Sequence, residues 1–285
     1  MSTKSQHPFR SHTVHFATMH GKEKILAPLF EEAGMRCVVA FIDTDKFGTF
    51  SGEVERVGGV RDNLRKKISA AAATNKDARF ILASEGSFVP HPLIGLFQTD
   101  LESLLLFDRE TGCEIYAEHL SSNPVHVEKA LGPRDDFRAA LREMGFPEHS
   151  VIVRPETSCQ PMFKGLKNER DVAQAMIDCF SASQTAKVIL ATDLRADQNP
   201  TRRLAIYEAG KSLIDSFNSL CPSCSYPGFS IVEGVPGLPC SECGAKSRAA
   251  RAVVFACPKC QQTEERSRAD GLRAIDSSEC EFCNP

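Results

Sequence analysis

Residues 12–43 read "HTVHFATMHGKEKILAPLFEEAGMRCVVAFID" and decide the fold class, because two apolar runs flank an amphipathic stretch. Apolar side chains recur at helical spacing over residues 22–34, and the glycine that closes this stretch is a common helix stop. The flanking runs, 12–18 and 35–43, have the composition of strands, and the second is of the buried type. Pro28 predicts that the regular helix begins late, since proline is best tolerated in a first turn. The stretch therefore predicts a strand, a helix and a second strand.

The same alternation continues to residue 219. Helical patterns cover residues 60–73, 133–145, 168–180 and the stretch from Pro200, and strand patterns cover 78–84, 150–155 and 186–192. A hairpin of "ESLLLFD" and "CEIYAEH" surrounds the turn at 109–112. Repeated β-α-β units predict an α/β domain, a layered mixed β-sheet flanked by helices, to which the hairpin adds antiparallel strands. We place this domain at 1–219 and a small C-terminal domain at 220–285, because the final helix meets the first cysteine pair there.

The composition excludes several classes of protein. Of the 285 residues, 42% are hydrophobic and 25% are charged, which is ordinary for a soluble globular protein. A net charge of −3 gives the whole molecule no attraction to nucleic acid or to anionic membranes. The first residues contain no apolar run of signal-peptide length, and no segment approaches a membrane span. We expect a cytoplasmic protein without a membrane partner, and the oligomeric state stays open.

Eight of the twelve cysteines lie in the last 65 residues, arranged as four C-x-x-C pairs. The pairs are CPSC (Cys221, Cys224), CSEC (Cys240, Cys243), CPKC (Cys257, Cys260) and CEFC (Cys280, Cys283). Each C-x-x-C turn directs two sulfurs at one point and so forms half of a tetrahedral thiolate site. A disulfide framework would require an oxidising compartment, and a thioredoxin-like motif would explain one pair and not four. The sequence thus predicts a zinc-ribbon-like domain with two structural Zn²⁺ ions, and sequential, interleaved and nested pairings all stay open.

Closed Cys₄ sites leave the metal no open position, so they stabilise a fold and do not catalyse. From Cys221 onward there are seven basic and eight acidic side chains. Because two Cys₄–Zn²⁺ centres each add a formal −2, the net charge of the tail is about −5. This balance argues against a nucleic-acid contact for the tail as a whole and leaves room for a local basic face only. The four other cysteines are expected to be reduced and not zinc-bound: Cys37, Cys113, Cys159 and Cys179.

Polar side chains follow four of the predicted strands, at the end of a sheet where ligands bind in α/β proteins. The candidates are His20 and Lys22 after the first strand, Asp45 and Glu53 after the second, Ser84, Glu85, Ser87 and His91 after the third, and Asp193, Arg195, Asn199, Thr201 and Arg202 after the last. Carboxylates from two loops, with lysine and arginine from two others, suit a divalent cation beside a phosphate group. We therefore expect a small anionic or phosphate-containing ligand at these strand ends.

Each of these strand ends is also explained as a solvated turn. Asn199 and Pro200 form an N-cap and a first helical residue, and "SEGSF" forms a turn in which glycine supplies flexibility. Arg202 is then an exposed first-turn residue placed against the helix dipole, and its replacement by alanine would be neutral or slightly stabilising. As part of an anion clamp, Arg202 would instead carry the stabilisation that bound phosphate provides. The P-loop, dinucleotide-binding and nucleophile-elbow motifs do not occur in the sequence.

Over nearly its whole length the chain resembles a bacterial family of domains of unknown function. The resemblance rests on "DTDKFGTFSGEVER", "GGVRDNLRKKI", "SEGSFVPHP", "TDLRADQNPTR", "CPSCSYPGF", "GLPCSECG" and "CEFCNP". It implies no established activity.

The first part of the chain is also similar to the inosine-triphosphatase-like nucleotide pyrophosphatases, through "ATMHGKE", the 43–55 loop, "ASEGSF" and "DQNPTRR" in that order. This resemblance implies that Lys22 and Arg202 touch phosphate, and that Glu85 holds Mg²⁺ together with Asp45 or Glu53.

The chain departs from the pattern of these pyrophosphatases at several places. His20 stands where that family has asparagine, and Gln198 where it has lysine. Segment 120–185 has no counterpart in the resemblance, which covers less than half of the chain.

Two functions are compatible with these observations. One is a metal-dependent hydrolase of a phosphorylated or nucleotide-like substrate, with Glu85, Asp45, Glu53 and Lys22 as catalytic residues and a structural zinc-binding tail. The other is a non-catalytic zinc-ribbon binding or adaptor protein that contacts a protein or a nucleic acid.

Overall fold

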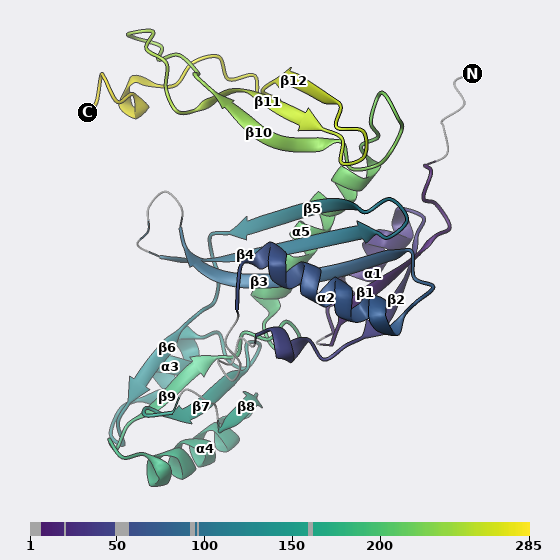
Figure 1. The fold of residues 1–285 in the computed structure, drawn as a ribbon. Coiled ribbons are helices and arrows are strands. Elements are labelled where there is room, and N and C mark those ends of the chain that lie inside the picture. Colours follow the sequence, from purple (N-terminus) through teal and green to yellow (C-terminus); the bar gives the residue numbers. More distant parts are fainter. Residues whose placement is uncertain (1–6, 20, 49–56, 92–94, 96, 159–161) are drawn as a thin grey trace. The chain divides into compact units, whose positions relative to one another are not determined.

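The computed structural model describes residues 7–19, 21–48, 57–91, 95, 97–158 and 162–285. The chain divides into two compact units (Figure 1). One is Phe9–Ile214, and the other is Asp215–Pro285 with the start of the chain, of which His7 and Pro8 are described. The division falls inside α5 (Pro200–Asn218). The predicted fold class is confirmed: layered sheets and helices precede a tail with two cysteine clusters.

A five-stranded sheet with the order β2-β1-β3-β4-β5 positions the charged site. Its strands are β1 (Thr13–Thr18), β2 (Arg36–Phe41), β3 (Phe80–Pro90), β4 (Gln98–Asp108) and β5 (Cys113–Ser121). Strand β1 is parallel to β2 and β3, whereas β3, β4 and β5 are antiparallel to their neighbours. The chain leaves β1 in one direction to β2 and then crosses back to β3. The order of the strands therefore reverses beside β1, which is where ligands bind in open α/β sheets.

Helices cover both faces of this sheet. Helix α2 (Val60–Thr74) lies on one face, and α1 (Glu23–Glu32) and α5 lie on the other (Figure 1). A buried stripe on α2, formed by Leu64, Ile68 and Ala71, packs in one core with residues of β3 and β4. On the opposite face α5 approaches α1 closely at Gly210, where an added Cβ would lie 2.5 Å from Leu26 Cδ2.

Three local features of this sheet differ from the sequence predictions. Pro28 lies inside α1, which already begins at Glu23, so the helix does not begin late. Strand β2 was predicted to be buried, but it is an edge strand that pairs with β1 on one side only. Its side chains Val39 and Phe41 are therefore exposed. Strand β3 continues to Pro90, so "SEGSF" is not a turn: pairing with β4 across its whole length keeps it extended.

A second sheet with the order β6-β9-β7-β8 includes much of segment 120–185. Its strands are β6 (Glu128–Leu131), β7 (Val151–Pro155), β8 (Phe163–Leu166) and β9 (Val188–Thr192), and its helices are α3 (Phe137–Glu143) and α4 (Glu169–Ala182). All its pairings are antiparallel. The short strands β6 and β8 were not predicted, since four residues hold too little pattern. A core around Val153, Val172 and Leu190 joins the helices to the sheet.

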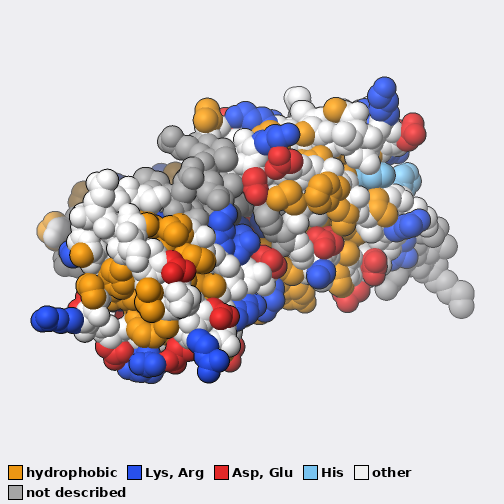
Figure 2. Space-filling model, turned by 90° about the horizontal axis from the view of Figure 1, so that it is seen from below, with side chains coloured by type: hydrophobic (Ala, Val, Ile, Leu, Met, Phe, Trp, Pro, Cys, Tyr) orange, Lys and Arg blue, Asp and Glu red, His pale blue; other side chains and the backbone are white. Residues whose placement is uncertain are grey.

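The tail contains a three-stranded antiparallel sheet, β10 (Ser230–Pro236), β11 (Ala250–Ala256) and β12 (Thr263–Ser267). Two 3₁₀ turns complete the description, η1 (Thr44–Phe47) in the first unit and η2 (Ser277–Glu279) in the tail. Among the described residues, no helix has the length and hydropathy to cross a membrane. On the face drawn in Figure 2, acidic and basic side chains are interspersed, in keeping with the small net charge of −3.

Candidate functional site

The eight paired cysteines form two groups of four in the tail. One group is Cys221, Cys224, Cys257 and Cys260, and the other is Cys240, Cys243, Cys280 and Cys283. The Sγ–Sγ distances across the pairs are 3.6 Å in the first group and 3.7 and 3.9 Å in the second. Four thiolates at about 2.3 Å from a tetrahedral Zn²⁺ lie about 3.8 Å apart, whereas a disulfide requires about 2.0 Å. The sulfur geometry therefore fits two Zn²⁺ ions, which would stabilise the tail without catalysing.

The antiparallel sheet explains which pairs share a metal. The first pair precedes β10, the second connects β10 to β11, the third connects β11 to β12, and the fourth follows β12. Because each strand runs back along its neighbour, the first and third pairs meet at one end of the sheet and the second and fourth at the other. The pairing is thus interleaved, one of the three arrangements that the sequence left open.

Each C-x-x-C turn is closed by a backbone hydrogen bond that directs N–H groups toward sulfur. The N–H of Ser225 donates to the carbonyl of Cys221 at 2.9 Å, and that of Asn284 donates to the carbonyl of Cys280 at 2.8 Å. The backbone N–H groups of Cys283 and Phe282 lower the pKa of Cys280 to about 7. At Cys280 the turn therefore favours the thiolate form that binds zinc.

Three of the four remaining cysteines lie in the described part of the chain. Cys37, Cys113 and Cys179 belong to neither zinc group and form no disulfide within the described residues. Burial is the main reason that the pKa values of Cys37 and Cys179 are raised to about 11, so both stay protonated near neutral pH. Cys159 lies outside the described residues.

A second candidate site is built on the five-stranded sheet, around the buried carboxylate of Glu102 in β4. Arg202, in the first turn of α5, places its Nε 2.6 Å from Glu102 Oε1 and donates from Nη1 to the carbonyl of Leu194 at 2.5 Å. Lys22, immediately before α1, places its Nζ 3.5 Å from Glu102 Oε2. Arg202 and Glu102 are only 2% and 1% exposed. Glu102 therefore joins the starts of two helices to strand β4.

Lys67 of α2 contributes a third buried cation from the opposite face of the sheet. Its Nζ donates to the carbonyl of Ser84 at 2.9 Å and forms an ion pair with Glu85. Burial lowers the pKa of Lys22 to about 8; Glu102 raises it, and Arg202 and Lys67 lower it further. Arg202 and Lys67 are thus close enough to Lys22 to affect its pKa, although Lys67 approaches from the other face of the sheet.

A further acid, Asp100, completes this charged cluster. Asp100 and Glu102 are two residues apart in β4, so their side chains leave the same face of the sheet. Burial raises the pKa of Asp100 to about 7, Glu102 raises it as well, and Arg202 and Lys22 oppose the rise. Its Oδ1 accepts no hydrogen bond from any described residue.

The structure gathers some of the predicted site residues and separates others. Lys22, Ser84, Glu85 and Arg202 belong to the charged cluster just described, and Ser87 shares with Glu85 the face of β3 that lies toward α2. The expectation that Arg202 is exposed is wrong. Its guanidinium is buried because Glu102 and the Leu194 carbonyl compensate the charge that the helix N-terminus disfavours.

The other residues of the "TDLRADQNPTRR" turn serve the local fold. Asp193 is paired with Arg195 and accepts from the backbone N–H of Gly165 at 3.1 Å. Asn199 Oδ1 accepts from the backbone N–H of Arg202 at 3.0 Å, so Asn199 is the predicted N-cap. Thr201 Oγ1 lies 2.8 Å from His149 Nε2.

Of the remaining candidates, Asp45 lies in η1 and the ring of His91 packs against Phe97 at 4.8 Å. His20 and Glu53 lie outside the described residues. Among the described residues, no three acidic or histidine side chains converge as a metal-binding group. The Mg²⁺ ligands implied by the pyrophosphatase resemblance, Glu85 with Asp45 or Glu53, therefore find no support.

Sequence reasoning missed Lys67, Asp100 and Glu102. The signal was the alternation in "QTDLESLLLFD", where two acids share one face of a strand that is otherwise buried. Lys67 likewise lies next to Ile68 within the buried stripe of α2.

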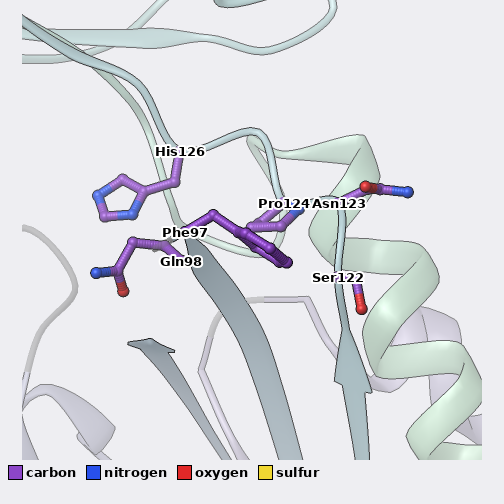
Figure 3. A pocket seen from close by; sticks show the side chains of 6 residues that line it. All are labelled: Phe97, Gln98, Ser122, Asn123, Pro124 and His126. Atoms are coloured by element: carbon purple, nitrogen blue, oxygen red, sulfur yellow. The ribbon is translucent and has the colours of Figure 1, made fainter. Parts of the chain in front are cut away.

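A cavity of about 560 Å³ lies where β4 begins. Its lining is shown in Figure 3: Phe97, Gln98, Ser122, Asn123, Pro124 and His126. The His126 ring packs against Phe88 at 4.8 Å, and Phe88 is the cross-strand partner of Asp100. Because Gln98, Asp100 and Glu102 occupy alternate positions of β4, the side chain of Gln98 leaves the same face of the sheet as those of Asp100 and Glu102.

The fold and these sites define an α/β protein with a cysteine-rich tail, in which two groups of four cysteines could each hold a metal ion. Residues 66–285 match the family model described as "Domain of unknown function (DUF6671)", and the chain belongs to this family. It is 27% identical over 146 residues to a formamidopyrimidine-DNA glycosylase from Enterococcus faecalis, a match that covers 48% of this chain. The chain spans about half the length, 52%, of that curated relative.

Among solved structures, protein VC0702 from Vibrio cholerae is similar with a TM-score of 0.32 and 9% identity, over 73% of this chain and 95% of that one. Similarity at this level carries no inference. None of these comparisons supports the resemblance to nucleotide pyrophosphatases.

Proposed function

We propose that the unit formed by Phe9–Ile214 binds the phosphate group of a small molecule at the carboxyl end of β1. With the help of a divalent cation, it hydrolyses the bond between this phosphate group and the rest of the molecule. The observation that supports this proposal is the burial of three cations, Lys22, Lys67 and Arg202, around one strand end. Lysine and arginine are rarely buried without a functional or structural partner. Phosphate oxygens are the acceptors that such a group of donors suits.

Lys22 is the cation best placed to contact a ligand. It lies four residues after the end of β1, and its ion pair with Glu102 at 3.5 Å is long for a hydrogen bond. Within the described residues, its Nζ donates no hydrogen bond, so its three N–H groups are available to phosphate oxygens. Arg202 and Lys67 already donate to carboxylates and carbonyls, and they contribute mainly positive potential.

In the proposed hydrolysis, the oxygen of water forms a bond to phosphorus while the bond from phosphorus to the leaving oxygen breaks. Water gives up a proton, and the leaving oxygen takes up one. A divalent cation, when bound, polarises the phosphate. Lys22 and Arg202 stabilise the negative charge that develops on the phosphate oxygens, and the carboxylates of the cluster accept the proton from water.

The test is a screen of nucleoside triphosphates, diphosphates and simple phosphate esters with Mg²⁺, with phosphate and pyrophosphate release as the readout. We expect release from at least one substrate, and a large loss with Lys22→Met. The matched control is Lys46→Met, since Lys46 is a solvent-exposed lysine in η1. No release from any substrate at high enzyme concentration would contradict hydrolysis, and equal activity of the two variants would exclude Lys22.

A second candidate function is contact with nucleic acid or protein through the tail. It is favoured by the similarity to a protein whose name is that of a DNA glycosylase. In the tail, Arg266 lies over the ring of Phe255 at 4.3 Å, an arrangement found in surfaces that stack bases. The ion pair of Arg266 with Glu264 reduces its charge toward phosphate.

Fluorescence anisotropy with single- and double-stranded DNA and RNA tests this second function. Binding that weakens steeply with salt would support it, because phosphate contacts release counterions. Absence of binding at low salt would limit the tail to stabilising the fold or contacting a protein.

A further inference from the structure

Two buried carboxylate oxygens on one face of β4 lack hydrogen bonds. Asp100 Oδ1 and Glu102 Oε2 accept none from the described residues, although the two side chains are only 2% and 1% exposed. An unsatisfied buried oxygen of a carboxylate is costly, because the charge has lost its water without a replacement. Lys22 Nζ lies 3.5 Å from Glu102 Oε2, so these two oxygens at alternate positions of β4 indicate that an electropositive partner in addition to Lys22 can bind.

The strand register places a residue without a side chain beside one of these carboxylates. Asp100 and Glu102 are about 7 Å apart along the strand, a separation that side chains of unequal length bridge easily. The cross-strand partner of Glu102 on β3 is Gly86, which has no side chain to occupy this face. On the other side, His119 of β5 is opposite Glu102.

We propose that Asp100 and Glu102 bind a divalent cation such as Mg²⁺ or Mn²⁺, which enters together with the phosphate group of the substrate. This inference rests on the proposed function and assigns the metal to a different pair of acids from Glu85 and the acids of residues 43–55. Cations of this type prefer oxygen ligands, and Mg²⁺ is commonly held by one or two carboxylates, water and substrate phosphate. The absence of a third converging acid among the described residues is therefore compatible with such a site.

The charges of the cluster indicate why the two ligands enter together. The cluster contains three basic and three acidic side chains: Lys22, Lys67 and Arg202, with Glu85, Glu102 and Asp100. It is therefore neutral when all six side chains are ionised. A divalent cation alone would leave an excess of two positive charges beside buried lysine and arginine. A phosphate dianion alone would leave an excess of two negative charges beside Asp100 and Glu102. Bound as a pair, they preserve neutrality, and each ligand strengthens the binding of the other.

The experiment uses the full zinc-loaded chain and two probes, Mn²⁺ and inorganic phosphate. Mn²⁺ binding is measured by electron paramagnetic resonance with and without phosphate, and phosphate binding by calorimetry with and without Mn²⁺. The variant is Asp100→Asn, which is nearly isosteric. The matched control is Asp108→Asn, because Asp108 is an equally buried acid at the other end of β4, paired with Arg79.

In the wild type we expect phosphate to tighten Mn²⁺ binding by at least tenfold. Asp100→Asn should weaken Mn²⁺ binding by at least tenfold and should leave phosphate binding without metal equal or stronger, while Asp108→Asn keeps both wild-type affinities. Wild-type Mn²⁺ affinity in Asp100→Asn, or Mn²⁺ binding that phosphate does not change, would overturn the inference. If the wild type binds Mn²⁺ but no phosphate under any condition, the proposed phosphate hydrolysis is wrong, and Asp100 and Glu102 are not its metal site. If the wild type binds phosphate but no Mn²⁺, only the assignment of the metal to Asp100 and Glu102 is wrong.

Discussion

Replacement of Arg202 by alanine tests whether Arg202 forms a buried ion pair with Glu102 or is an exposed residue of α5. Removing one member of a buried ion pair costs about 3–5 kcal/mol, because the other charge stays buried without compensation. Here Lys22 still faces Glu102 at 3.5 Å, which places the expected cost near the lower end, about 3 kcal/mol. The carbonyl of Leu194 also loses a donor. For a unit of this size, 1 kcal/mol corresponds to about 2–4 °C, so the transition should fall by about 6–12 °C.

The assay is thermal and urea unfolding of the full zinc-loaded chain, followed by far-ultraviolet circular dichroism. Arg203→Ala is the matched control, since Arg203 is the next residue of α5 and is exposed. We expect Arg203→Ala to stay within about 0.5 kcal/mol of the wild type. In a Glu102→Gln background, Arg202→Ala should cost clearly less, because no carboxylate is left unpaired. If Arg202→Ala were as mild as Arg203→Ala, the buried ion pair would not exist in solution.

Three further predictions concern the metal sites, the charged cluster and the helix packing. Metal analysis should find about two zincs per chain, about one after Cys221→Ser with Cys257→Ser, and none after Cys221→Ser with Cys240→Ser; equal contents in the two double variants would contradict interleaved pairing. Because the pKa of Asp100 is raised to about 7 from 3.8, its ionisation opposes folding, and stability should fall as pH rises from about 4 to about 7. Asp100→Asn should remove this part of the pH dependence in urea titrations, and an unchanged slope would refute it. Gly210→Ala should destabilise by about 1 kcal/mol, since overpacking against two leucines of α1 outweighs the gain in helix propensity; a stabilised variant would show that the helices are farther apart.

Local chemistry made the metal sites predictable. A C-x-x-C turn brings two sulfurs together through a few backbone torsions, so the sequence alone determines four half-sites in the tail. The N-cap at Asn199 and the stripe of α2 were readable for the same reason, because their partners lie within one or two turns of helix. The alternation of strand and helix likewise determined the α/β class.

Contacts between distant parts of the chain were decided by the tertiary structure alone. Which cysteine pairs share a metal depends on the direction of three strands, and not on the turns themselves. Arg202 meets Glu102 across 100 residues of sequence, and neither residue carries a local sign of the other. A charged side chain in a first helical turn looks exposed in sequence, because burial depends on a compensating charge that only the folded sheet brings within reach.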